Sequence, residues 1–181
     1  MARTKLEELR TEILKYIGIP YHKNIPKIIS SDNVLVGKGS AKEIALKTIE
    51  FANEKNIKLI DLNPQQIYNF QKKHHLGIDC SGLACHLLNL YFETKLNVRH
   101  TSAAMLTSKP LSQKISITEV KTGDLIRQKS GHHLLFIVEK IDNQIIYVDS
   151  SFKGRGVRYG EFDISDQNFK YDGVYRLLLL N

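Results

Sequence analysis

Residues 79–92 read DCSGLACHLLNLYF, and this stretch decides the fold. Its apolar residues recur at helical spacing and are nearly continuous, namely Leu83, Ala84, Leu87, Leu88 and Tyr91. Such a pattern predicts a helix across residues 80–92 that is buried on most sides. Asp79 stands where its side chain can cap the first turn, and Ser81 and Gly82 are small enough for that turn to approach another element closely. We therefore expect this to be the central helix.

Three further helices are predicted on the N-terminal side of the central one. Residues 4–17 place apolar side chains on one face and charged ones opposite, and Gly18 then stops the pattern. Residues 41–53 repeat a helical pattern, and a short helix starts at Pro64 and runs toward residue 73. The N-terminal half of the chain is therefore predicted to be helical.

A glycine-rich turn precedes the second of these helices. Gly37 and Gly39 invite comparison with a phosphate-binding loop, but the glycine spacing of a Walker loop or a dinucleotide fingerprint is absent. The favoured interpretation is a flexible turn in which Ser40 caps the following helix.

The periodicity changes in the C-terminal half. A polar linker spans residues 97–114, and β-rich runs follow at residues 124–128, 133–141, 144–149 and 171–180. The Asp142-Asn143 step between two of these runs is typical of a hairpin turn. Helices that are followed by antiparallel strands predict an α+β fold. We expect residues 1–62 to form a helical extension packed on a core domain of residues 63–181.

Composition limits the class of protein. The 181 residues are 42% hydrophobic and 25% charged, without an apolar run long enough to span a membrane, so one soluble globular domain is expected. The first twenty residues carry too many charges for a secretory signal, and only two cysteines are present, which favours a cytoplasmic, reducing location. The formal charge of +7 is scattered and lacks interleaved aromatic residues, so nucleic-acid binding is disfavoured.

Cys80 is the most informative residue for function. It is expected at the N-terminus of a buried helix, where unpaired N–H groups and the helix dipole favour the thiolate over the thiol. The alternative is a core cysteine with no chemical role, which the local pattern leaves open. Cys85 falls on another side of the helix and is expected to pack in the core.

A nucleophilic cysteine requires a general base, and a histidine pair is available. His132 and His133 open the most apolar β run, and a hairpin brings Asp149 or Ser150 back beside them to orient an imidazole. His74 and His75 could join this pair in a zinc site. No motif with metal-ligand spacing occurs in the sequence, so no metal is expected.

Three motifs follow one another along the chain: DCSGL at residues 79–83, TGDL at 122–125 and a strand opened by histidine that contains IVE at 137–139. This order resembles the NlpC and CHAP group of bacterial papain-like cysteine peptidases and amidases, whose pattern is DCSGL on a helix, then PGDL, then a strand such as HVGIV. The resemblance covers residues 76–150, less than half of the chain. It implies a papain-like core, in which the helix that carries the cysteine packs on an antiparallel sheet, with an N-terminal helical extension outside it.

The resemblance also implies roles for individual residues. Cys80 would be the nucleophile and His133 the base, with His132 as the alternative because strand register decides which imidazole faces the thiol. The third polar position falls at Asp149, with Ser150 one residue away. The residues expected to contact the substrate are Asp79, Ser81 and His132.

The sequence departs from the family pattern at three places. Thr122 replaces a proline, and bulky Leu134 and Leu135 follow the strand histidine, where relatives have a small residue. Ile19-Pro20-Tyr21 resembles a GxPY element that supplies a site tyrosine shortly before the cysteine. Here almost sixty residues lie between Tyr21 and Cys80, so the role of this tyrosine stays open.

The function implied by the resemblance is amide hydrolysis through an acyl-thioester, without a cofactor. Peptidoglycan stem peptides or their fragments are the leading substrates, although the missing signal sequence argues for recycled fragments, release by lysis or an unrelated amide. Two other classes remain open: a non-catalytic binding module of the same fold and a basic nucleic-acid-binding domain.

Overall fold

The computed structural model describes residues 3–23 and 30–178 and has an α+β architecture. Its α-helices are α1 (Lys5–Tyr16), α2 (Ala41–Glu54), α3 (Pro64–Lys73), α4 (Cys80–Phe92) and α5 (Ala103–Leu106). The first four agree with the predicted ranges to within one residue at each end. Each begins at a side-chain cap, which explains why their first residues can be predicted from the sequence. Ser40 caps α2, as expected.

The strands form one antiparallel sheet in the order β1-β6-β2-β3-β4-β5. They are β1 (Ser112–Ile115), β2 (Leu125–Gln128), β3 (His133–Ile141), β4 (Gln144–Ser151), β5 (Gly156–Asp163) and β6 (Gly173–Leu177). The predicted hairpin at residues 142 and 143 joins β3 to β4, with Ile141 opposite Gln144. Helices packed on an antiparallel sheet confirm the predicted α+β class.

The sequence-based prediction of a polar linker over residues 97–114 is wrong, because this segment contains α5 and part of β1. Strand β5 is absent from the predicted runs. Strand β6 begins two residues after the start of the predicted run over residues 171–180, of which residues 179 and 180 lie outside the described residues. Both β1 and β5 lie at edges of the sheet, where only one neighbour constrains the side chains. Edge strands therefore lack the strong apolar alternation by which central strands are recognised.

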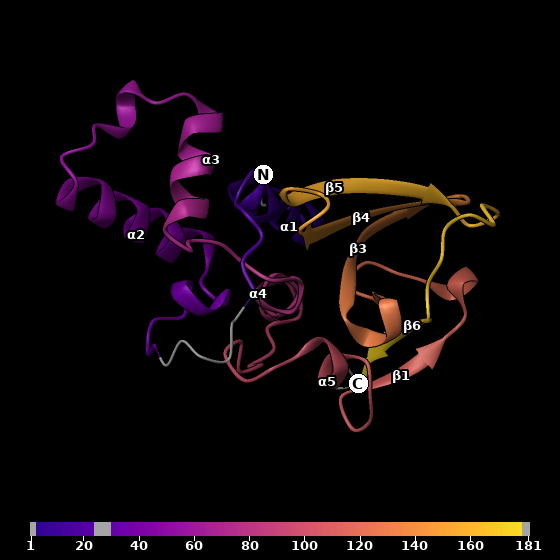
Figure 1. The fold of residues 1–181 in the computed structure, drawn as a ribbon. Helices are drawn as coiled ribbons and strands as arrows, with labels where there is room; N and C mark the ends of the chain where they lie inside the picture. The colour runs from indigo at the N-terminus through magenta and orange to yellow at the C-terminus, as the bar shows by residue number, and fades with distance from the viewer. Residues whose placement is uncertain (1–2, 24–29, 179–181) are drawn as a thin grey trace.

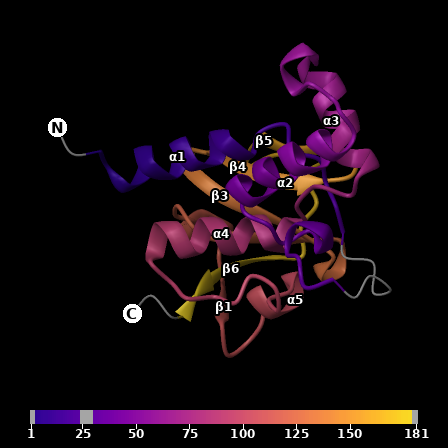
Figure 2. The ribbon, with the colours of Figure 1, turned by 90° about the vertical axis from the view of Figure 1, so that its left-hand side faces the viewer.

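The helices cover one face of the sheet, and α4 lies between the α2–α3 pair and the strands (Figure 1). Helices α1 and α4 run side by side across this face (Figure 2). The residues through which these two helices face each other and the sheet are almost fully buried, and β3 side chains that point toward the helices pack among them. The resulting core includes Leu9, Ile13, Leu83, Leu87, Leu134 and Phe136. The amphipathic stripe of α1 is thus explained by its contact with α4.

A second core covers the opposite face of the sheet. The alternate β3 residues Leu135 and Ile137 pack there with Ile145, Phe162 and Val174. The Phe169 ring stacks on Phe162 with 3.6 Å between ring centroids and helps to cover this face. Because β3 is buried on both sides, its apolar run is nearly continuous rather than alternating.

The TGDL segment serves the fold. Asp124 is buried and accepts two hydrogen bonds from Arg176, at 2.9 Å from Nε and 2.7 Å from Nη2, which raises the pKa of Arg176. Gly123 has a φ of +90°, and a Cβ there would lie 2.1 Å from the Phe92 ring. This turn therefore fixes the C-terminal end of α4 against the sheet. Among the described helices, none is long and apolar enough to cross a membrane.

Candidate active site

Cys80 is the first residue of α4 and is only 8% exposed. The Asp79 carboxylate caps the helix by accepting a hydrogen bond from the Gly82 N–H at 2.6 Å. The backbone N–H groups of Leu134 and Ser81 face the sulfur and lower the pKa of its thiol through hydrogen bonding. Since Leu134 follows His133 in β3, the thiol lies where α4 meets the start of that strand.

The N-terminus of α4 is held by segments that are distant in sequence. Ile78 bridges Tyr21 in parallel and Lys38 in antiparallel orientation, and the Asp79 N–H donates to the Gly37 carbonyl at 2.9 Å. A Cβ on Gly82 would lie 2.7 Å from the same Gly37 carbonyl oxygen. The small residue in the DCSGL motif therefore permits the close approach that the sequence predicts.

His133 and Asp149 form a buried pair between β3 and β4. The imidazole Nε2 lies 2.9 Å from the Asp149 Oδ2, and the residues are 6% and 3% exposed. Arg158 on β5 approaches the other carboxylate oxygen, with 3.5 Å between Nε and Oδ1. With Nε2 bonded to the carboxylate, Nδ1 is the ring nitrogen that remains for proton exchange.

The sequence left Ser150 open as an alternative to Asp149, and His132 as an alternative to His133. Ser150, the other candidate for orienting a histidine, donates a hydrogen bond to the Ile78 carbonyl at 2.7 Å, away from the imidazoles. His132 is exposed and lines the cavity in front of Cys80. The structure thus brings Asp149 to His133, and leaves His132 at the mouth of the site.

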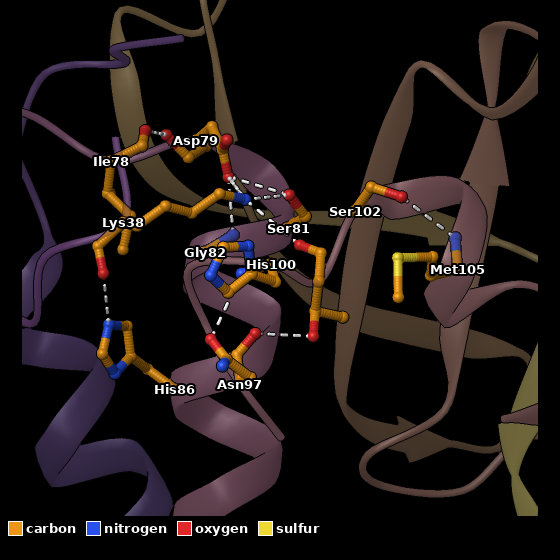
Figure 3. A network of polar contacts seen from close by, with 12 residues as sticks. Lys38, Ile78, Asp79, Ser81, Gly82, His86, Asn97, His100, Ser102 and Met105 are labelled. Atoms are coloured by element: carbon orange, nitrogen blue, oxygen red, sulfur yellow. Dashed lines mark hydrogen bonds and ion pairs between the residues drawn. The ribbon is translucent and has the colours of Figure 1, made fainter. Parts of the chain in front are cut away.

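A buried lysine that the sequence did not single out joins the N-terminus of α4 (Figure 3). The Lys38 ammonium donates to Asp79 Oδ1 at 3.0 Å, to Ser81 Oγ at 2.5 Å and to the Thr101 carbonyl at 3.3 Å. The Ser81 hydroxyl donates to the same Asp79 oxygen at 3.0 Å. Asp79 and Ser81, both predicted to contact substrate, are therefore engaged by side chains of the chain itself.

The predicted low pKa of Cys80 is wrong. Burial raises the pKa of its thiol to about 11, and the Asp79 carboxylate raises it further. The Leu134 N–H and the Lys38 ammonium act in the opposite direction but do not outweigh burial. The sequence shows the helix terminus but not the depth of the sulfur below the surface, and desolvation of the thiolate dominates here.

A cavity of about 420 Å³ opens in front of Cys80. Its walls include Tyr21, His100, Thr101 and His132, so the segment around residues 97–104 is part of the site. Burial, together with Cys80 and Asp79, raises the pKa of Tyr21 to about 12, which keeps its phenol neutral. Tyr21 therefore lies at the site even though almost sixty residues separate it from Cys80 in the sequence. This separation is why the sequence alone left its role open.

The remaining cysteine and histidines lie elsewhere. Cys85 is fully buried, as expected, and burial raises the pKa of its thiol to about 12; both cysteines are free. His74 packs on Phe70 with 4.6 Å between ring centroids, and His75 lies near His22. Within residues 3–23 and 30–178, no group of three or more histidine, cysteine or acidic side chains is arranged to hold a metal ion.

The Cys80 thiol and the cavity in front of it therefore lie near the start of β3, where Asp149 orients the His133 imidazole, and His132 rather than His133 lines that cavity. Such a set can perform nucleophilic acyl transfer. No family model, no curated protein and no solved structure matches the chain.

Proposed function

We propose that this chain is a cysteine hydrolase that cleaves amide bonds, with a papain-like core of the NlpC and CHAP type. The observation that carries the proposal is the buried His133–Asp149 pair, with 2.9 Å between Nε2 and Oδ2, at the strand end against which the Cys80 thiol lies. An acidic partner that fixes one imidazole nitrogen leaves the other to act as a base toward the thiol.

The reaction proceeds by acyl transfer. The Cys80 sulfur attacks the amide carbonyl carbon while its proton passes to His133, and the C–N bond then breaks as the imidazolium protonates the departing amine. Water attacks the resulting thioester and gives its proton to His133. The acid leaves, and the proton returns to the sulfur. Because the resting thiol is neutral, proton transfer accompanies attack.

The developing oxyanion requires hydrogen-bond donors near the thiol. In the first turn of α4 the Gly82 N–H is already bonded to Asp79, which leaves the N–H groups of Cys80 and Ser81 as the donors nearest the thiol. Tyr21 lines the cavity and keeps its phenolic proton because its pKa is raised to about 12. Loss of one such donor typically costs an enzyme about 3 kcal/mol of transition-state stabilisation.

Peptidoglycan peptides or their fragments are the proposed substrates, a choice supported by the family resemblance and compatible with the formal charge of +7. A cytoplasmic location, where recycled wall fragments would be met, belongs to the same proposal. Residues 63–181 are the proposed hydrolase domain, to which the N-terminal residues Tyr21 and Lys38 add side chains.

The test is cleavage of purified peptidoglycan and of its isolated stem peptides, followed by liquid chromatography and mass spectrometry. We expect Cys80→Ala to abolish turnover and His133→Ala to lower kcat at least about 100-fold. The matched control is His132→Ala, which removes the neighbouring imidazole and should alter KM more than kcat. Full activity of Cys80→Ala, or equal kcat losses in the two histidine variants, would sink the assignment.

A non-catalytic binding module is the second candidate, and the raised pKa of Cys80 favours it, because a neutral buried thiol is a poor nucleophile. The two candidates differ in one measurement. A binding module retains peptides on the wild-type chain without releasing new amines, whereas a hydrolase releases one amine for each bond that it cleaves.

A further inference from the structure

A second cavity, of about 490 Å³, adjoins the first. We call it the basic cleft and define it by Tyr21, Tyr68, Lys72, Phe152, Lys153 and Arg155, which line it. Tyr21 lines both cavities, so one side chain stands between the basic cleft and the space in front of Cys80. A ligand held at the thiol can therefore extend past Tyr21 into this cleft.

The walls of the basic cleft come from helix α3 and from the turn between β4 and β5. Helix α3 contributes Tyr68 and Lys72, and the turn contributes residues 152–155. The start of β5, directly after this turn, is tied to the N-terminal segment, because the Val157 N–H donates to the Ile19 carbonyl at 2.9 Å. A Cβ on Gly156 would lie 2.1 Å from the same carbonyl oxygen. The turn is thus anchored where it enters β5, directly after Arg155.

The charge of the basic cleft is of one sign. Three cationic side chains line it, Lys72, Lys153 and Arg155, and none of the described lining residues is acidic. None of the three forms an ion pair with a described residue. Converging like charges without a counter-charge raise the local concentration of anions.

The other lining groups suit an organic anion. The Lys72 ammonium lies 5.8 Å from the centroid of the Phe152 ring, which is 75% exposed, and two tyrosine rings line the same cleft. The Gln65 amide donates to Asn69 at 3.0 Å, so both amides keep hydrogen-bonding capacity toward the cleft. Aromatic side chains together with cations, one of which lies over a ring face, match a chain that carries carboxylates.

We propose that the basic cleft binds a carboxylate-bearing segment of the peptide that is cleaved at Cys80, and so selects acidic substrates. The inference rests on the proposed hydrolase function for the cleavage step, but binding in the cleft does not require the thiol. Carboxylate groups would pair with Lys153 and Arg155, while the intervening chain lies against Tyr21 and Phe152.

The test uses the full chain with Cys80→Ala, so that no peptide is consumed. Acetylated and amidated tetraglutamate is titrated at about 50 mM salt, with tetraglutamine as the neutral comparison, and amide NMR shifts are followed. We expect tetraglutamate to shift the amides of residues 65–72 and 152–155, and tetraglutamine to leave them almost unchanged.

A matched pair of double variants separates the cleft from overall charge. Lys153→Gln with Arg155→Gln should weaken tetraglutamate binding about fivefold, because each exposed charge contributes modestly. Lys42→Gln with Lys55→Gln makes the same change in net charge on exposed positions outside the cleft and should weaken binding less than about twofold. Folding of each variant is checked by its NMR spectrum.

Three results would overturn the proposal: equal weakening by both double variants, equal binding of tetraglutamine, or tighter binding of inorganic phosphate to the same amides. The last would make the cleft a phosphate site. Since binding is measured without turnover, failure of the hydrolase assignment alone would leave tetraglutamate binding intact. Failure of the cleft alone would leave peptide cleavage at Cys80 intact.

Discussion

At the scale of single residues, burial sets the protonation state of the Cys80 thiol before any substrate arrives. The sulfur is at a helix N-terminus, yet the residue is 8% exposed and the pKa of its thiol is raised to about 11. A thiolate–imidazolium pair at rest is therefore disfavoured. In the proposed reaction His133 accepts the proton during attack, so the orientation of its imidazole by Asp149 is central to that proposal.

This protonation state has a measurable consequence for alkylation. The rate of iodoacetamide reaction at Cys80 in the native chain should rise about tenfold per pH unit between about pH 8 and 10, because the thiolate fraction grows in that way below the pKa. Peptide mass spectrometry separates Cys80 from Cys85. The urea-unfolded chain is the control and should level off near pH 9. A native plateau already reached below pH 7 would contradict the neutral resting thiol.

Lys38 carries a second prediction at this scale. Its ammonium is buried on Asp79, so Lys38→Met leaves a buried carboxylate without its cation and should lower the free energy of unfolding by about 3 kcal/mol. Urea unfolding followed by circular dichroism measures the change. Lys15→Met removes an exposed lysine that is bonded to Glu12 and should have a much smaller effect. Similar midpoints for the two variants would show that the buried pair contributes little.

At the scale of elements, α4 is specified by its own residues, whereas the site around it is not. The cap at Asp79 and the apolar run that follows it fix both ends of the helix in the sequence. The burial of Lys38 could not be predicted, because a lysine between two glycines is typical of an exposed turn and its side-chain partners are more than forty residues away. Strand β5 could not be predicted, because Arg158, Gly160 and Glu161 interrupt its apolar pattern.

The close approach at the start of α4 predicts the effect of Gly82→Ala. Alanine is the better helix former by about 1 kcal/mol, but its Cβ would meet the Gly37 carbonyl oxygen at 2.7 Å. We expect a net loss of about 2 kcal/mol in the free energy of unfolding, since backbone must move to relieve the contact. Leu90→Ala, at an exposed position of the same helix, should cost less. A Gly82→Ala variant that is more stable than wild type would show that the contact is readily relieved.

At the scale of the whole molecule, the N-terminal residues contribute to the core and to the site. Leu9 and Ile13 of α1 are fully buried in the core that contains α4, while Tyr21 and Lys38 reach the surroundings of Cys80. Local sequence patterns predict α1 well, because its stripe is periodic. They cannot predict where Tyr21 lies, since that follows from pairing with Ile78 across the fold.

The chain should therefore not tolerate removal of residues 1–62. We expect the fragment of residues 63–181 to lose cooperative thermal unfolding and to bind a hydrophobic dye, because it lacks the α1 side chains and leaves Asp79 without Lys38. Calorimetry and dye fluorescence of the fragment and the full chain make the comparison. A sharp calorimetric transition in the fragment would establish that residues 63–181 fold on their own.

The pairing of the N-terminal segment with β5 also limits strand pairing between two copies of the chain at this edge of the sheet. Edge strands present unpaired backbone groups that recruit strands of other chains and start aggregation. Here the backbone of Val157 is bonded to Gly18 and Ile19, and the exposed charges of Arg158 and Glu161 follow along the same edge. The segment that carries Tyr21 thus also covers the first part of the edge at which another strand could otherwise pair.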